Sequence, residues 1–124
     1  WQHVLEPLSG YLQLALSLRD EPLSFSGAWN FGPSNSEVRT VLEVAELIVA
    51  RMGRGEINIH ESSSNQHEAN LLKLNCDKAQ QLLGWSPKWA IDKALTATAD
   101  WYKEVSLGSD IIDVTHKQIT DYFG

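Results

Sequence analysis

The sequence predicts a small mixed α/β lobe of about five helices and three short strands. Stretches with an apolar residue every three or four positions indicate amphipathic helices, and three short apolar runs between turn-forming or polar residues indicate strands. These strands are too short and too few for a free-standing doubly wound sheet. A chain of 124 residues, of which 43% are hydrophobic, can bury one core, so we expect a single domain over residues 1–124.

The first predicted helix lies within residues 1–18. Its apolar positions from Val4 to Leu18 recur at spacings of three and four, which places them on one stripe of a helix. Pro7 stands near the start, where a missing backbone N–H costs little, and Glu6 places negative charge near the positive end of the helix dipole. Gly10 lowers helix stability by about 1 kcal/mol relative to alanine, and close packing is one reason for a glycine there.

A loop and a short strand are expected next, followed by a second helix. Residues 19–26 are charged and contain proline and serines, which favours a loop, whereas the apolar run 28–31 between glycines predicts a strand. Thr40 and Glu43 have the spacing of a capping box, so a helix should begin there and end at Gly53.

The second half of the chain predicts two more strands and three helices. Residues 56–61 alternate between polar and apolar, and 71–74 form another short apolar run, so both are predicted strands. A helix capped by Asn75 should stop at Gly84, with Trp85 folding back on it. The remaining predicted helices are the long stripe that begins at Ile91 and ends at Gly108, and the stretch 115–123.

The composition excludes several classes of function. A net charge of −6 argues against a surface for nucleic acid or an anionic membrane, and no apolar run approaches the roughly 20 residues of a membrane span. No secretory signal is recognisable at the start. The single cysteine, Cys76, cannot form an internal disulfide, which favours the cytoplasm. Acidic residues are scattered rather than set at the spacing of metal ligands, so we predict no metal site.

The sequence contains no catalytic motif that we recognise. Gly53 and Gly55 lack the third glycine and the strand–turn–helix context of a dinucleotide-binding turn. No tyrosine is followed four positions later by lysine, because Tyr11 and Tyr102 precede alanine and serine at that spacing and Tyr122 is too near the end. We therefore predict that these residues include no catalytic group and bind no NAD.

Three blocks carry a family resemblance that covers nearly the whole chain. They resemble the CDP-glucose 4,6-dehydratases, which are extended short-chain dehydrogenases/reductases, and they read WQHVLEPLSGYL (1–12), GAWNFGP (27–33) and HEANLLKLNCDKAQQLLGWSPKW (67–89). The resemblance implies a lyase that converts CDP-glucose into CDP-4-keto-6-deoxyglucose and water with tightly bound NAD. It also implies that this chain is the C-terminal, substrate-binding lobe, is inactive alone, and partners an N-terminal Rossmann domain outside the sequence.

The resemblance further implies two groups of substrate-binding residues. The entrance motif supplies Trp1, Gln2, His3 and Glu6, and a later loop supplies His67, Glu68 and Asn70. Many relatives have a phosphate-binding arginine in that later loop, and its absence here leaves His67 or Lys73 as weaker substitutes. For His3 and His67, a purely structural hydrogen bond to the backbone is the competing interpretation.

Two other functions remain open at this point. The same fold can serve an epimerase, or a dehydratase that acts on another nucleotide sugar. Alternatively, the chain can be a stand-alone lobe without enzymatic activity, acting as a nucleotide-sugar sensor or an interaction module. The sequence of the missing catalytic part would distinguish an epimerase, or a dehydratase for another nucleotide sugar, from a CDP-glucose 4,6-dehydratase. An independent start of translation would favour the stand-alone lobe.

Overall fold

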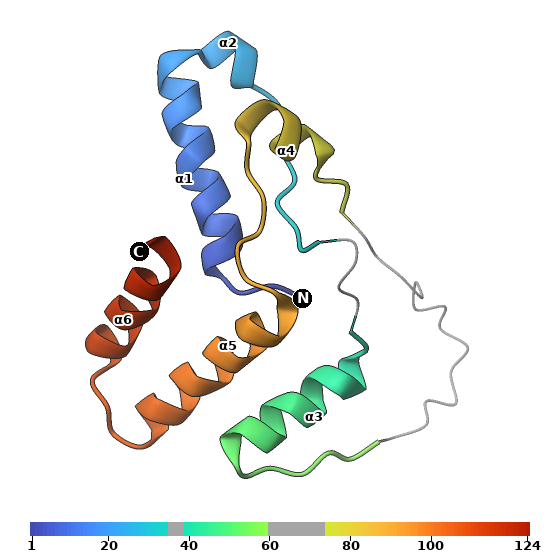
Figure 1. Ribbon diagram of the computed structural model, residues 1–124, viewed down its shortest axis with the longest axis vertical. Helices are drawn as coiled ribbons and strands as arrows, with labels where there is room; N and C mark the ends of the chain where they lie inside the picture. The colour runs from blue at the N-terminus through green and yellow to red at the C-terminus, as the bar shows by residue number, and fades with distance from the viewer. Residues whose placement is uncertain (35–38, 60–73) are drawn as a thin grey trace.

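The computed structural model describes residues 1–34, 39–59 and 74–124. Its helices are α1 (Leu5–Asp20), α2 (Pro22–Phe25), α3 (Val41–Met52), α4 (Asp77–Leu83), α5 (Ile91–Ser106) and α6 (Ile111–Phe123). In Figure 1, α1, α2 and α4 occupy the upper half of the molecule, and α3 and α5 lie side by side below them. The C-terminal helix α6 packs on α5 and ends beside α1.

The predicted α/β class is wrong, because the described residues contain helices and no strand. The run 28–31 is irregular, as are the described parts of the other two predicted strands, residues 56–59 and residue 74. The rest of those two predicted strands, residues 60–61 and 71–73, lie outside the described residues.

Side chains, rather than a neighbouring strand, hold the run 28–31. A strand is stable only when its backbone groups pair with those of another strand. Here Lys78 Nζ donates to the carbonyl of Ala28 at 3.0 Å, and Gln2 Nε2 donates to the carbonyl of Phe31 at 3.0 Å. A short apolar run between glycines carries no information about whether a partner strand exists, and the strand prediction for residues 28–31 failed for this reason.

The predicted capping box of α3 and the terminal glycines of α3 and α4 are confirmed, whereas the N-cap of α4 is Cys76 rather than the predicted Asn75, whose Oδ1 accepts from the N–H of Asp77 at 2.9 Å. The backbone N–H of Glu43 donates to Thr40 Oγ1 at 3.2 Å, and Glu43 Oε2 accepts from the Thr40 N–H at 2.7 Å, which completes the capping box of α3. Gly53 ends α3 in the left-handed conformation, with φ of 70°. Beyond α4, the N–H of Trp85 returns to the carbonyl of Ala79 at 3.1 Å, and Trp85 is buried.

The described residues include one helix that was not predicted, and several helix boundaries differ from the prediction. Helix α1 continues to Asp20, and α5 ends at Ser106 rather than at Gly108. Residues 22–25 form the short helix α2 inside the predicted loop, with Pro22 in its first turn. Helix α6 begins at Ile111 rather than Thr115, because Asp110 Oδ1 accepts from the N–H groups of Ile112 (2.8 Å) and Asp113 (3.1 Å). An aspartate before an apolar pair is an N-cap signal that the sequence analysis overlooked.

Two clusters of buried apolar residues form the core. The first joins α4 to the segment 28–31, and the second lies between α3 and α5. Their buried members are Phe31, Cys76, Ala79, Leu83 and Trp85 in the first cluster, and Val44, Ile91 and Leu95 in the second. The free thiol of Cys76 is therefore a small core group next to the start of α4.

Gly10→Ala is expected to destabilise the fold by about 1–3 kcal/mol, although alanine favours a helix by about 1 kcal/mol. A Cβ atom at position 10 would overlap the ring of Phe31, which packs against the backbone of α1. Urea unfolding measures the loss. Phe31→Leu in the same chain should reduce the penalty of Gly10→Ala in a double-mutant cycle. An unchanged or raised stability in Gly10→Ala would contradict the close approach of this ring.

Candidate functional site

The predicted entrance residues lie together at the start of the chain. Trp1, Gln2 and His3 precede α1, and Glu6 lies in its first turn. Their surroundings differ sharply, because His3 and Glu6 are buried whereas Trp1 is 54% exposed. The residues predicted in the later loop, His67, Glu68 and Asn70, lie outside the described part of the chain, and their role stays a prediction.

Glu6 binds three donors from elsewhere in the chain. Its carboxylate accepts from the backbone N–H groups of Lys88 (3.0 Å) and Trp89 (2.8 Å) and from the hydroxyl of Tyr122 (2.7 Å). Only 1% of the Glu6 surface is exposed. A buried carboxylate requires such partners, because an unpaired charge is costly to bury. Glu6 therefore joins α1, the connection before α5 and the end of α6.

Tyr122 contacts the first turns of α1 through its hydroxyl. The oxygen lies 2.7 Å from Glu6 Oε2 and 3.0 Å from Ser9 Oγ, which also accepts from the indole N–H of Trp85 at 3.0 Å. Burial raises the pKa of Tyr122 to about 12, so its hydroxyl keeps its proton at neutral pH. The sequence analysis missed this residue, because a tyrosine in an amphipathic terminal helix carries no signal of a polar partner.

His3 is a neutral, buried imidazole. Burial lowers the pKa of His3, while a hydrogen bond with the Gln118 side chain and the charge of Glu6 raise it to a smaller extent. The N–H of Leu5 donates to Nδ1 at 3.3 Å, which places the proton on Nε2. The ring lies 4.9 Å from that of Trp89. At neutral pH His3 thus offers no positive charge to a phosphate, and the described contacts fit its structural interpretation.

Trp1 and Gln2 border an apolar groove of about 420 Å³ between α3 and α5. One wall comes from successive turns of α3, the other from α5, and the two N-terminal residues complete the lining. The residues concerned are Trp1, Gln2, Val44, Ile48, Met52, Leu95, Thr98, Ala99 and Tyr102. Among them, the amide oxygen of Gln2 is a buried acceptor without a hydrogen-bond partner. Such an arrangement of apolar walls with few polar groups is typical of a small-molecule site.

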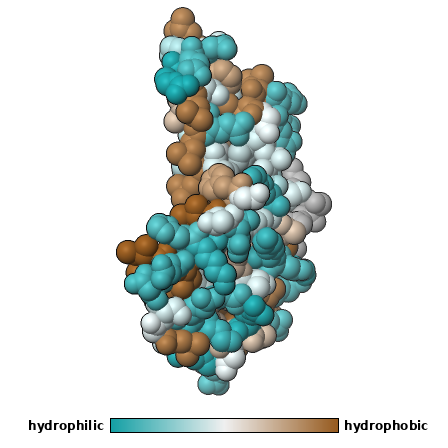
Figure 2. Space-filling view, turned by 60° about the vertical axis from the view of Figure 1, so that its left-hand side comes forward, coloured by the Kyte–Doolittle hydropathy of each residue, from teal (hydrophilic) through white to brown (hydrophobic). Residues whose placement is uncertain are grey.

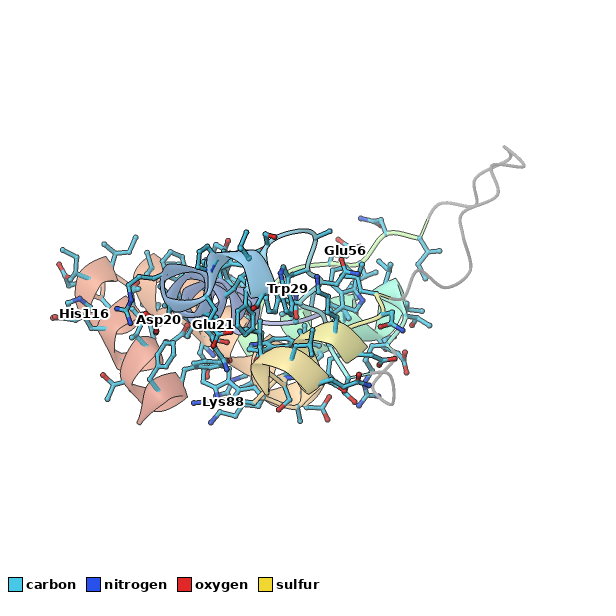
Figure 3. The ribbon with its side chains drawn as sticks, turned by 90° about the horizontal axis from the view of Figure 1, so that it is seen from above. Asp20, Glu21, Trp29, Glu56, Lys88 and His116 are labelled. Atoms are coloured by element: carbon cyan, nitrogen blue, oxygen red, sulfur yellow. The ribbon has the colours of Figure 1, made fainter. Side chains whose placement is uncertain are left out.

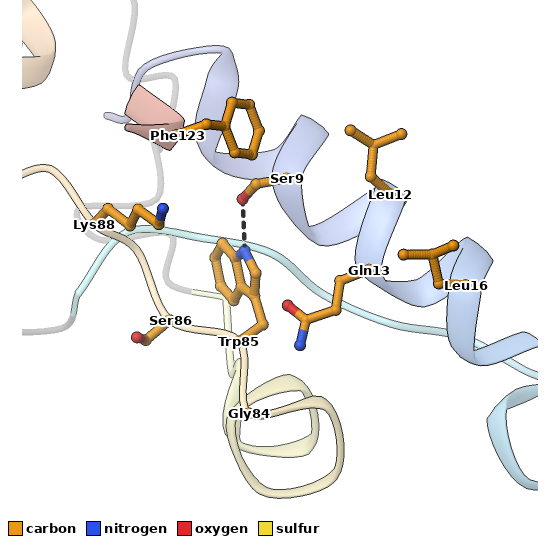
Figure 4. Close-up of a pocket in the computed structure, with 9 residues that line it drawn as sticks. All are labelled: Ser9, Leu12, Gln13, Leu16, Gly84, Trp85, Ser86, Lys88 and Phe123. Atoms are coloured by element: carbon orange, nitrogen blue, oxygen red, sulfur yellow. Dashed lines mark hydrogen bonds between the residues drawn. The ribbon is translucent and has the colours of Figure 1, made fainter. Parts of the chain in front are cut away.

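A second cavity, of about 410 Å³, lies between α1, the segment after α4 and the end of α6 (Figure 4). Its lining contains Ser86 and Lys88, which the sequence analysis did not single out. Lys88 Nζ donates to the carbonyl of Tyr122 at 3.2 Å and lies 5.4 Å from the ring centre of Phe123. Because this ammonium group already binds the end of α6, we interpret it as part of the helix contact.

Histidine and acidic groups elsewhere do not form a further site within the described ranges. His116 is exposed on the outer side of α6, far from Trp29 (Figure 3). Across residues 1–34, 39–59 and 74–124, no three histidine, cysteine or acidic side chains are grouped as metal ligands would be. None of the described helices is both long enough and apolar enough to cross a bilayer.

Comparison with known proteins gives one informative relative. No protein-family model matches the chain. The CDP-glucose 4,6-dehydratase of Salmonella typhimurium is 38% identical over 122 residues, which cover 98% of this chain and 34% of the relative. The chain thus spans about a third of the length of the curated relative that it matches. The similarity seen in the three sequence blocks is confirmed, and it extends over nearly every residue of this chain.

Proposed function

We propose that the chain is the nucleotide-sugar-binding part of a CDP-glucose 4,6-dehydratase. The observation that carries the proposal is the 38% identity over 98% of the chain. A match of that extent leaves no large segment of this chain to serve an unrelated purpose. The reaction proposed for the whole enzyme is the conversion of CDP-glucose into CDP-4-keto-6-deoxyglucose and water, with NAD supplying the hydride chemistry. We place the protein in the cytoplasm, where the unpaired thiol of Cys76 would stay reduced.

The described residues do not fit NAD. A dinucleotide-binding turn needs glycines that lead from a strand into a helix, so that the pyrophosphate meets the helix N-terminus. Here Gly53 ends α3 with φ of 70°, and Gly55 follows it without a strand before or a helix directly after. We therefore assign no cofactor contact and no chemical step to these residues. The NAD site and the catalytic groups are proposed to lie in the rest of the enzyme.

Within the proposed binding part, the entrance residues divide into two roles. Trp1 and Gln2 border the groove between α3 and α5 and are proposed to contact substrate. His3 and Glu6 are proposed to position the segment that carries Trp1 and Gln2, since both are buried and hydrogen-bonded to other parts of the chain. His67, Glu68 and Asn70 remain proposed substrate contacts from outside the described residues.

The chain is expected to bind CDP-glucose weakly and not to convert it. With only part of the site present, we expect millimolar affinity, or about −4 kcal/mol. Titration of the ¹⁵N-labelled chain with CDP-glucose, and with glucose 1-phosphate as control, measures binding. Incubation with CDP-glucose and NAD should yield no 4-keto-6-deoxy product. Absence of binding at several millimolar would contradict the proposed role, and NAD-dependent product from enzyme free of contaminants would show a catalytic site in this chain.

A further inference from the structure

His3 supplies the acceptor for the first backbone N–H of α1. The Leu5 N–H donates to Nδ1 at 3.3 Å, and Val4, the residue before the helix, makes no capping hydrogen bond with its side chain. The first four N–H groups of a helix have no partner inside it, so an acceptor from elsewhere stabilises the start of the helix. Histidine can accept only in its neutral form, because both ring nitrogens of an imidazolium are donors.

The same imidazole joins the start of the chain to two later segments. His3 is 5% exposed, its ring lies 4.9 Å from that of Trp89, and its side chain is hydrogen-bonded to Gln118 of α6. Gln118 Nε2 donates to the carbonyl of Ala97 at 2.6 Å, so Oε1 is the atom that can accept from His3 Nε2. With Nδ1 accepting and Nε2 donating, the neutral tautomer satisfies both nitrogens of the ring.

One acidic group faces His3 from α1. Glu6 attracts an imidazolium, but its carboxylate already accepts from the backbone N–H groups of residues 88 and 89 and from the hydroxyl of Tyr122. Burial outweighs that attraction, and the pKa of His3 lies below its ordinary value of 6.5. The folded chain therefore binds this proton less readily than a chain in which His3 is exposed to water.

Positive charge approaches the same region from two other elements. Lys93 of α5 places its Nζ 4.7 Å from the centre of the Trp89 ring, which lies beside His3. Lys88, in the connection before α5, places its Nζ 5.2 Å from the ring centre of Tyr122. The start of α1 adds the positive end of the helix dipole. A charged His3 would meet repulsion from each of these groups.

We propose that His3 is an acid-sensitive cap of α1, and that its protonation releases residues 1–3 from Trp89 and Gln118. An imidazolium no longer accepts from the Leu5 N–H, and it is better solvated in water than in this site. Below the ordinary pKa of 6.5, the released chain binds the proton and the capped chain does not. Each further pH unit then favours release by up to about tenfold, until the capped form is protonated as well. The device follows from the fold and does not depend on the proposed function.

The test is an NMR titration of the ¹⁵N-labelled 124-residue chain, without nucleotide, from about pH 7.5 to about pH 5. The signals followed are the ring nitrogens of His3, the backbone amide of Leu5 and the side-chain amides of Gln2 and Gln118. We expect them to share one midpoint, below the ordinary pKa of 6.5. The amide of Gly53, at the end of α3, should keep its shift, because the release is local.

His3→Asn keeps an acceptor near the position of Nδ1 but takes up no proton in this range, so the acid response of Leu5 and Gln118 should disappear. His116→Asn, at an exposed histidine of α6, is the matched control and should respond like the parent. The other histidines remain in His3→Asn, so a response that they cause would persist there. If His3→Asn unfolds, the parent titration decides, because the His3 ring and the Leu5 amide must share a midpoint.

The outcomes concern the cap rather than nucleotide binding. A midpoint for His3 at or above 6.5, a Leu5 amide that does not follow the His3 ring, or an acid response that survives in His3→Asn would overturn the inference. A parallel response of Gly53 would also overturn it, because it would show general unfolding in place of local release. Failure here leaves the proposed function standing, and failure of CDP-glucose to bind at neutral pH leaves the cap standing.

Discussion

Glu6→Ala is expected to lower the free energy of unfolding by about 3–4 kcal/mol. The change removes the acceptor for the N–H groups of Lys88 and Trp89 and for the Tyr122 hydroxyl. All three donors then remain in a site where Glu6 itself was 1% exposed, so water cannot readily replace the carboxylate. A buried donor without a partner costs about 1–3 kcal/mol. Chemical denaturation with tryptophan fluorescence measures the effect.

Matched variants distinguish this hydrogen-bond cluster from a general effect of losing an acidic residue. Tyr122→Phe removes one donor and leaves the backbone bonds of Glu6, so we expect a loss of about 1 kcal/mol. Glu46→Ala, at an exposed position on α3, should change stability by less than about 0.5 kcal/mol. A Glu6→Ala chain as stable as Glu46→Ala would contradict the described cluster.

The same cluster makes stability depend on alkaline pH. The pKa of Tyr122 is raised by burial to about 12 from the ordinary value of 10. Between these two values the unfolded chain loses the phenolic proton while the folded chain retains it. The unfolded state therefore binds fewer protons, and stability falls as pH rises from about 10 to 12. Comparing denaturation midpoints of the parent chain and Tyr122→Phe isolates this contribution, which should be absent in the variant.

Local signals in the sequence were sufficient for most helices. The capping box at Thr40 and the terminal glycines at Gly53 and Gly84 act through bonds within a few residues, so the sequence contains both partners. The predicted strands failed for the opposite reason. A run such as 28–31 is a strand only if another strand lies beside it, and in the described residues its carbonyls bind the side chains of Gln2 and Lys78.

The family resemblance singled out the entrance residues, and their role in binding stays a prediction. The contacts that their side chains make could not be predicted from the sequence. From the sequence, Glu6 was interpreted as a negative charge near the positive end of the helix dipole. No neighbouring residue indicates that Glu6 binds Tyr122, which lies 116 residues further along the chain. The orphan oxygen of Gln2 depends on the path of residues 28–31, which the strand prediction had wrong. The hydrogen-bond partners of these side chains therefore depend on contacts between segments that are distant in the sequence.

An exposed apolar stripe runs along α1. Val4, Leu8, Leu12 and Leu16 recur every four residues and are 61%, 43%, 60% and 56% exposed. Figure 2 shows hydrophobic surface in a line down the side of the molecule turned forward. Residues four apart form a continuous ridge on a helix, which is the surface that packs into a neighbouring element. An uncovered apolar ridge of this kind is a surface through which the chain, on its own, can associate.

Concentration-dependent self-association is therefore expected for the isolated chain, and the paired change Leu12→Lys, Leu16→Lys should weaken it at least tenfold. Each lysine replaces exposed apolar surface with a charge that would have to be desolvated on association. Sedimentation velocity over a range of concentrations and binding of a hydrophobic dye give two independent measures. The matched control, Ile59→Lys with Leu107→Lys, alters residues that are 73% and 77% exposed but lie off the ridge, so it should associate like the parent. Equal association in both variants would place the contact elsewhere, and a strictly monomeric parent without dye binding would show that the ridge needs no partner.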